Sequence, residues 1–237
     1  YRDRALFTDL DQSLLGDADG VRRFVETMHQ NRKCATFGIA TGRRLDSALA
    51  VLKRHGVPRP DILITSLGTE IHYAPRLDRD QYWKDHVDYL WRPAAVRRVL
   101  AELPGLVPQP KGEQTVEDIA ALLRSEDITA NLVHSFGQFL DVIPSRASKG
   151  QALRYVAQRR NIPLDHILVA GGSGADEDMM RGNTLAVVVA NRHGEELSQL
   201  EDLERIYFAG QPFAFGILEA MEHYDFLDSC RPPPSSG

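Results

Sequence analysis

Short apolar runs alternate with amphipathic stretches at both ends of the chain. Runs of the length expected for buried strands fall at residues 5–7, 35–40, 62–64, 167–170 and 185–189. Stretches with the spacing of helices separate them, at residues 21–30, 45–55, 151–160 and 176–181. Strands that alternate with helices of this length predict an α/β fold, in which helices cover both faces of a parallel sheet.

The middle of the chain has a different pattern. Aromatic and charged residues are frequent between residues 71 and 147, and runs typical of buried strands are few. The spacing there predicts helices at 94–103 and 116–125 and a strand pair at 129–134 and 139–143. We therefore expect a Rossmann-like core of residues 1–70 and 148–237, and a small α+β cap of residues 71–147 inserted over the carboxyl ends of the core strands.

Composition narrows the classes of function. The 237 residues carry a formal net charge of −5, with 43% hydrophobic and 26% charged residues. This charge argues against a nucleic-acid partner, because phosphate backbones bind basic surfaces. Nor does any apolar stretch reach the roughly 20 residues of a membrane-spanning helix. With only two cysteines, Cys34 and Cys230, we expect neither a disulfide framework nor a zinc site, and a reducing, cytoplasmic setting.

Two carboxylates follow the first apolar run. Asp9 and Asp11 come directly after the predicted first strand, and α/β sheets bind ligands at the carboxyl ends of their strands. Side chains two positions apart can point the same way. One carboxylate can then attack phosphorus while the other protonates the leaving oxygen. The alternative interpretation is a turn that carries a solvated acidic pair.

Two further polar positions stand where helices are expected to begin. Thr41 and Gly42 end the second apolar run, where a hydroxyl and a close backbone approach can bind a phosphoryl oxygen. Lys149 opens the helix that follows Ser148, and its ammonium can neutralise a phosphate and neighbouring carboxylates. Taken alone, a threonine before a glycine is more often a helix cap, and a single lysine is more often exposed on the surface.

A glycine-rich acidic segment at residues 170–178 follows the fourth apolar run. Its glycines allow close approach, and its acids can lie near a cation. It lacks the spaced glycines of the dinucleotide-binding fingerprint, which also belongs after a first strand rather than a late one. A plain turn is the other interpretation.

The order of these segments resembles the haloacid dehalogenase superfamily, whose motifs are Asp-x-Asp, Ser/Thr, Lys and Gly-Asp-x-x-x-Asp. The chain is similar, over nearly its whole length, to the sucrose-phosphatase family within it. The matching segments are Thr8-Asp9-Leu10-Asp11, Ala40-Thr41-Gly42-Arg43, Gly68-Thr69-Glu70-Ile71, Ser148-Lys149-Gly150 and Ile217-Leu218-Glu219-Ala220. Such a domain also occurs fused to the C-terminus of sucrose-phosphate synthases. The start at Tyr1, close to a strand, favours that fused bacterial form, linked to a glycosyltransferase domain.

The resemblance implies a Mg²⁺-dependent phosphatase that hydrolyses sucrose 6-phosphate, or another sugar phosphate, in sucrose biosynthesis. Asp9 would form an aspartyl-phosphate, and Asp11 would act first as general acid and then as general base. Thr41 and Lys149 would orient and neutralise the phosphoryl group. The implied metal ligands are Asp9, the Asp11 carbonyl and Asp176, and the implied substrate contacts are Gly42, Arg43 and Glu70.

Two positions depart from the family pattern. Gly172 stands where the family has a magnesium-binding aspartate, so we expect Mg²⁺ to bind more weakly. Thr115 runs directly into Val116, where the cap of the family has an aromatic Lys-x-Ser-Tyr strand. Gly172 also supports an alternative function, a catalytically impaired domain that binds a sugar phosphate and regulates, or docks on, a synthase.

Overall fold

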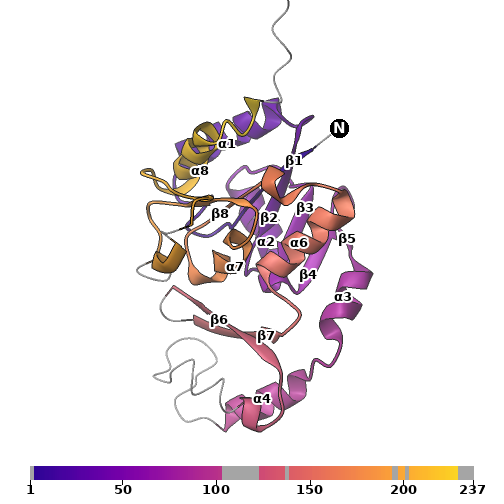
Figure 1. The fold of residues 1–237 in the computed structure, drawn as a ribbon. Helices are drawn as coiled ribbons and strands as arrows, with labels where there is room; N and C mark the ends of the chain where they lie inside the picture. Colours follow the sequence, from indigo (N-terminus) through magenta and orange to yellow (C-terminus); the bar gives the residue numbers. More distant parts are fainter. Residues whose placement is uncertain (1–2, 103–122, 137–138, 194–196, 201–202, 229–237) are drawn as a thin grey trace, which may run out of the picture.

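The apolar runs form the strands of one sheet in the computed structural model, which describes residues 3–102, 123–136, 139–193, 197–200 and 203–228 (Figure 1). The strand order is β10-β9-β8-β1-β2-β3-β4-β5, with β1 (Arg4–Thr8) in the interior. The other parallel strands are β2 (Ala35–Ala40), β3 (Ile62–Thr65), β8 (Ile167–Gly171), β9 (Leu185–Val188) and β10 (Ile206–Phe208). The predicted α/β class with a parallel sheet is therefore confirmed.

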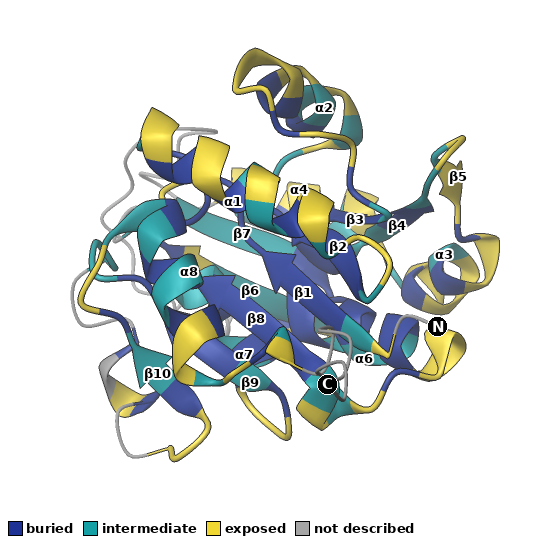
Figure 2. Cartoon of the chain, turned by 90° about the horizontal axis from the view of Figure 1, so that it is seen from above, coloured by how far each residue is buried: buried dark blue, intermediate teal, exposed yellow. Residues whose placement is uncertain are grey.

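Helices cover both faces of the sheet. Successive side chains of β1 point to opposite faces, so that Phe7 packs in one hydrophobic cluster and Leu6 in the other. The helices on the face of Leu6 are α1 (Ala18–Gln30), α2 (Leu45–Arg54) and α8 (Phe213–His223). Those on the face of Phe7 are α3 (Gln81–Asp88), α6 (Lys149–Arg160) and α7 (Glu177–Met180). Figure 2 shows the buried strands between these layers, which is why their sequences are mostly apolar.

A second, two-stranded sheet stands apart from the main one (Figure 1). Its strands, β6 (Ala130–Ser135) and β7 (Phe139–Pro144), pair antiparallel. Together with α4 (Pro93–Ala101) they enclose a small hydrophobic cluster formed by Val96, Val99, Leu123 and Ile128. β6 also contacts η3 (Gly174–Asp176), the turn that follows β8. Residues 116–122 of the helix predicted at 116–125 lie outside the described residues, and residues 123–125 are helical.

The main sheet extends beyond the boundary predicted from the sequence. β4 (Glu70–Tyr73) and β5 (Asp78–Arg79) join it as antiparallel strands. Trp83 of α3 then packs into the main core. The expected start of the cap at residue 71 therefore falls inside β4. The sequence does not reveal β4 and β5, because strands of four and two residues are too short for their pattern to be distinguished from that of a loop.

Two expectations from composition can be compared with the structure. Cys34 is disulfide-bonded, a bond that the cysteine count, which predicts no disulfide framework, does not indicate. Within the described ranges, no helix is both long and apolar enough to cross a membrane.

Candidate active site

Polar residues gather at the carboxyl ends of the central strands. Asp9 directly follows β1, Thr41 directly follows β2, and Asp176 ends η3 after β8. Lys149 is the first residue of α6, where Ser148 caps the helix. This edge of the sheet is where α/β proteins bind their ligands.

Lys149 joins two of these carboxylates. Its Nζ donates a hydrogen bond to Asp9 Oδ1 at 2.8 Å and another to Asp176 Oδ1 at 2.7 Å. The side chains of Lys149, Asp9 and Asp176 are 2%, 7% and 0% exposed. Because an unpaired buried charge is costly, each of the three groups depends on the others. The structure thus brings Asp9, Lys149 and Asp176 into one buried cluster.

Burial dominates the ionisation of this cluster. Removal from water raises the pKa of Asp9 to about 7, with Lys149 opposing the rise and Asp176 and Asp11 adding to it. Burial alone would lower the pKa of Lys149, but Asp176 and Asp9 outweigh it, and that pKa lies above its ordinary value. Lys149 is therefore an ammonium at neutral pH.

The second oxygen of Asp176 is held by the glycine-rich loop. Asp176 Oδ2 accepts hydrogen bonds from Gly172 N at 2.9 Å and Ser173 N at 3.0 Å, and Ser173 Oγ lies 3.3 Å away. Gly171 permits this approach, because a Cβ at that position would lie 2.3 Å from Asp176 Cγ. Both oxygens of Asp176 are therefore occupied, one by Lys149 and one by the loop.

Asp11 is paired with Arg43. Arg43 Nε donates to Asp11 Oδ2 at 2.7 Å and Nη2 donates to Asp11 Oδ1 at 2.8 Å, while Nη1 donates to Ser47 Oγ at 2.9 Å. The hydrogen bond to Asp11 raises the pKa of Arg43 above its ordinary value. The predicted substrate contact Arg43 therefore holds the predicted general acid.

The remaining predicted residues have different surroundings. Thr41 is fully buried, and its Oγ1 accepts a hydrogen bond from Arg43 N at 3.2 Å. Gly42 lies beside Leu67, which a Cβ at position 42 would meet at 3.4 Å. Glu70 takes part in local contacts instead, and its carboxylate lies 2.7 Å from Arg79 Nη2 and 3.4 Å from His72 Nε2.

The donors at this edge do not fit a tightly held Mg²⁺. Mg²⁺ demands about six oxygens in octahedral geometry, and the described residues contain no cluster of three acidic, histidine or cysteine side chains able to hold a metal. Gly172 offers no side chain. Lys149 donates to one oxygen of Asp9 and to one oxygen of Asp176, and the loop donates to the other oxygen of Asp176.

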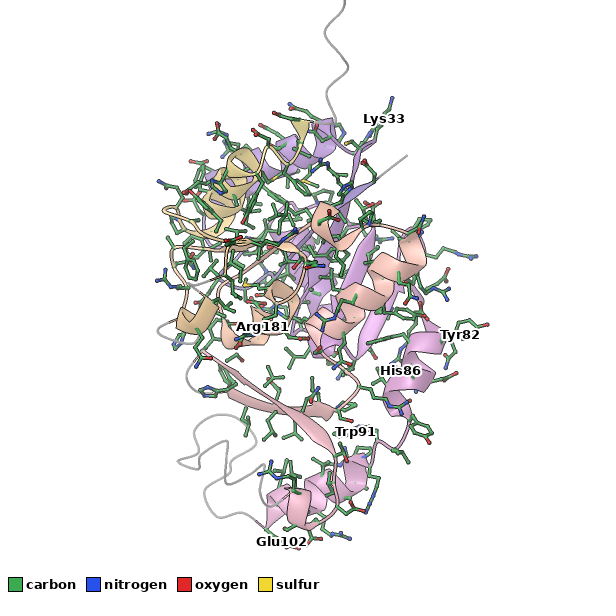
Figure 3. The ribbon with its side chains drawn as sticks, viewed as in Figure 1. Lys33, Tyr82, His86, Trp91, Glu102 and Arg181 are labelled. Carbon is green, nitrogen blue, oxygen red and sulfur yellow. The ribbon has the colours of Figure 1, made fainter. Side chains whose placement is uncertain are left out.

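A cavity of about 640 Å³ adjoins Lys149. Its wall combines β6, the start of α6 and the η3–α7 segment. The polar side chains of the wall that lie outside the predicted motifs are Asn131, His134, Gln151 and Arg181, while Glu177 and Asp178 belong to the acidic segment at residues 170–178. Figure 3 shows Arg181 at the boundary between the main sheet and the β6–β7 sheet. No motif marks Asn131, His134, Gln151 and Arg181, since they belong to β6, to α6 and to the residue after α7, which only the fold brings together.

The sequence and the fold are similar to those of several known proteins. The family described as Sucrose-6F-phosphate phosphohydrolase matches residues 2–225. Mannosylfructose-phosphate phosphatase of Agrobacterium fabrum is 29% identical, over 93% of this chain and 96% of that protein. Sucrose-phosphatase 1 of Nicotiana tabacum is 26% identical, over 96% of this chain. The solved structure of the Synechocystis sp. PCC6803 sucrose-phosphatase, in complex with sucrose and phosphate, superposes with a TM-score of 0.90 at 27% identity, covering 96% of this chain and 100% of that one.

The fraction of a relative's length that this chain covers differs from one relative to the next. It covers 60% of the tobacco sucrose-phosphatase. Glucosylglycerol-phosphate synthase of Pseudomonas anguilliseptica is 26% identical over 94% of this chain, which corresponds to 31% of the synthase. Similarity to this chain therefore also occurs within proteins much longer than the matched region.

Proposed function

Since the chain belongs to the sucrose-6F-phosphate phosphohydrolase family, we propose that it hydrolyses a sugar phosphate, with sucrose 6-phosphate as the first substrate to test. The observation that carries the proposal is the buried ammonium of Lys149 between Asp9 and Asp176. A buried cation beside a nucleophilic carboxylate can bind the anionic group that the carboxylate attacks. The cavity beside Lys149 has room for the sugar.

The first half of the reaction transfers the phosphoryl group. An unprotonated oxygen of Asp9 attacks phosphorus, the bond from phosphorus to the sugar oxygen breaks, and an aspartyl-phosphate forms. The Asp11 carboxyl gives its proton to the departing oxygen, so the sugar leaves as an alcohol. Lys149 lies 2.8 Å from Asp9 and can neutralise charge on the phosphoryl oxygens. Thr41 follows β2 at the same edge and can orient them.

The second half returns Asp9 to its starting form. Asp11, now a carboxylate, takes a proton from water, whose oxygen attacks phosphorus and releases inorganic phosphate. Arg43 orients the Asp11 carboxylate for this step, because both carboxylate oxygens accept its hydrogen bonds.

Magnesium dependence remains a prediction from the family, and no step above uses the metal. The donors present support a weakly bound Mg²⁺, which Asp9, the Asp11 carbonyl and Asp176 would hold, with Lys149 as a shared hydrogen-bond donor to the two carboxylates. The impaired regulatory domain is not favoured, because a phosphatase matches nearly the whole chain.

The wider setting follows from the relatives. The division into a core and an inserted cap is supported by the two separate sheets. A covalently linked synthase domain is supported by the match to part of a synthase. The absence of nucleic-acid partners is a further part of the proposal, consistent with a net charge of −5. The cytoplasmic location is expected from the cysteine count, and the disulfide at Cys34 counts against it, because disulfides are rare in the cytoplasm.

Phosphate release from a panel of esters tests the proposal. The panel contains sucrose 6-phosphate, mannosylfructose phosphate, glucose 6-phosphate and fructose 6-phosphate, each with and without Mg²⁺. We expect a disaccharide phosphate to be hydrolysed fastest, and Asp9→Asn to release none. Release no greater than that of Asp9→Asn from every ester would contradict the proposal.

A further inference from the structure

The first turn of α6, which carries Lys149, packs against the backbone of Gly68. Gly68 ends the short helix η1 (Ser66–Gly68) between β3 and β4. Its φ is +90°, and a Cβ there would lie 2.1 Å from Ser148 O and 2.8 Å from Lys149 N. Only glycine allows this approach. The backbone of Gly68 therefore restricts the position of the first turn of α6, and with it the position of Lys149.

Trp83 fixes Gly68 from the other side. Trp83 Nε1 donates a hydrogen bond to Gly68 O at 2.9 Å, and its side chain is almost completely buried. The indole also packs against Tyr155 of α6, with the ring centres 4.9 Å apart. Trp83 thus contacts the two segments, η1 and α6, that meet at the first turn of α6.

Asp80 holds Trp83 in place. Its carboxylate caps α3 by accepting from Trp83 N at 3.0 Å. The same carboxylate accepts hydrogen bonds from Tyr155 OH at 3.1 Å and Tyr73 OH at 3.1 Å. One buried carboxylate therefore ties α3 to both β4 and α6, which leaves the indole little freedom to shift away from Gly68.

We propose that Trp83 is a positioning residue for Lys149, acting through the hydrogen bond from its indole to Gly68 and the contact of Gly68 with the first turn of α6. The inference rests on the proposed function, in which Lys149 binds the phosphoryl group. Binding of a transferring phosphoryl group is sensitive to displacements well below 1 Å. α4 follows α3 along the chain (Figure 1). The contacts of Trp83 with Gly68 and Tyr155 therefore join the start of the segment that contains α4 to the helix that carries Lys149.

Trp83→Phe is the variant that isolates the hydrogen bond. Phenylalanine keeps an aromatic ring against Tyr155 and removes the indole N–H. Trp91→Phe is the matched control, because Trp91 lies between α3 and α4 and packs on the small cluster around Val96 (Figure 3). A general loss of packing can weaken phosphate binding too, so a second measurement must separate packing from the positioning of Lys149.

A double-mutant cycle supplies that measurement. Orthovanadate, which mimics the transferring phosphoryl group, is titrated by calorimetry into wild type, Trp83→Phe, Lys149→Met and the double variant. We expect Trp83→Phe to weaken vanadate binding about fivefold to tenfold, Trp91→Phe to leave it unchanged, and the double variant to bind within about twofold of Lys149→Met.

Two results overturn the inference alone. In the first, Trp83→Phe binds vanadate as wild type does. In the second, the effects of Trp83→Phe and Lys149→Met multiply, which means that Trp83 acts independently of Lys149. If wild type itself binds no vanadate, the proposed function fails and the inference fails with it. Vanadate binding to wild type distinguishes these cases.

Discussion

Arg43 and Asp11 form an ion pair with two hydrogen bonds, Nε to Oδ2 at 2.7 Å and Nη2 to Oδ1 at 2.8 Å. Thirty-two positions separate these residues along the chain, and the pairing arises because parallel strands β1 and β2 end side by side. A planar guanidinium that binds both oxygens fixes the direction of the carboxylate as well as its charge. Arg43 therefore determines where the proposed general acid and base points in the free protein.

Replacement of Arg43 should affect substrates unequally. In Arg43→Gln the Asp11 carboxylate loses both hydrogen bonds, and we expect phosphate release from the best sugar phosphate to fall about tenfold. Hydrolysis of p-nitrophenyl phosphate should fall less, because its leaving group needs little protonation. Initial rates on the two substrates check this. Arg44→Gln is the control, since the Arg44 side chain is 85% exposed. An equal loss on both substrates would argue against an action through Asp11.

Removal of Lys149 should destabilise the folded protein. Lys149→Met leaves the carboxylates of Asp9 and Asp176 buried beside each other without a cation. Breaking a buried pair in this way costs about 3–5 kcal/mol. Urea unfolding at neutral pH measures the change, with Lys33→Met, at an exposed position, as the control (Figure 3). A loss no larger than that of the control would show that the two acids do not depend on Lys149.

Asp9 should make stability depend on pH. Its pKa is raised from the ordinary value of 3.8 to about 7 in the folded protein, so the folded state binds the proton more tightly than the unfolded state. The resulting stabilisation is fully present below about pH 3.8 and is lost as the pH rises through 7. We therefore expect Asp9→Asn, which does not titrate, to gain in relative stability over wild type from pH 4 to pH 7.5.

Chemical unfolding in EDTA across this range measures the difference between the two proteins. Asp19→Asn is the control, because the Asp19 side chain is 75% exposed, and its difference from wild type should stay flat. A difference for Asp9→Asn that does not change with pH would contradict the raised pKa.

Local sequence patterns are sufficient to predict the central strands and the position of the polar residues that follow them. An apolar run such as residues 35–40 is buried at every position, and the carboxyl ends of neighbouring parallel strands necessarily meet. The order of strands and helices along the chain therefore predicts that Asp9, Thr41 and Asp176 lie at one edge of the sheet.

Long-range packing could not be predicted in the same way. The Arg43–Asp11 pair depends on two side-chain conformations, and the occupied state of Asp176 depends on the backbone of Gly172 and Ser173. The polar and aromatic neighbours of Trp83 in the sequence are typical of the predicted cap, although its indole donates a hydrogen bond to Gly68 in the main core. These contacts join segments whose local patterns carry no information about each other.

Gly172→Asp should create a stronger magnesium site. The backbone of Gly172 is not in the left-handed region, and a Cβ there would lie 3.0 Å from Val189 Cγ2, a side chain that needs to move by only a few tenths of an ångström. The same Cβ would lie 3.7 Å from Gln12 O, so the new side chain would start beside the segment that carries Asp9 and Asp11. A carboxylate here adds a charged oxygen to a donor set that lacks one.

We expect Gly172→Asp to bind Mg²⁺ about tenfold to a hundredfold more tightly than wild type, equivalent to roughly 1.4–2.8 kcal/mol, and to release phosphate faster. Calorimetric titration with MgCl₂ measures the affinity, and Gly172→Ala separates the carboxylate from the steric effect of the Cβ. Asp9→Asn in the Gly172→Asp background should abolish phosphate release, because the nucleophile is then absent. Equal Mg²⁺ affinities for Gly172→Asp and Gly172→Ala would mean that a carboxylate at position 172 does not reach the metal, and that Gly172 does not limit this site.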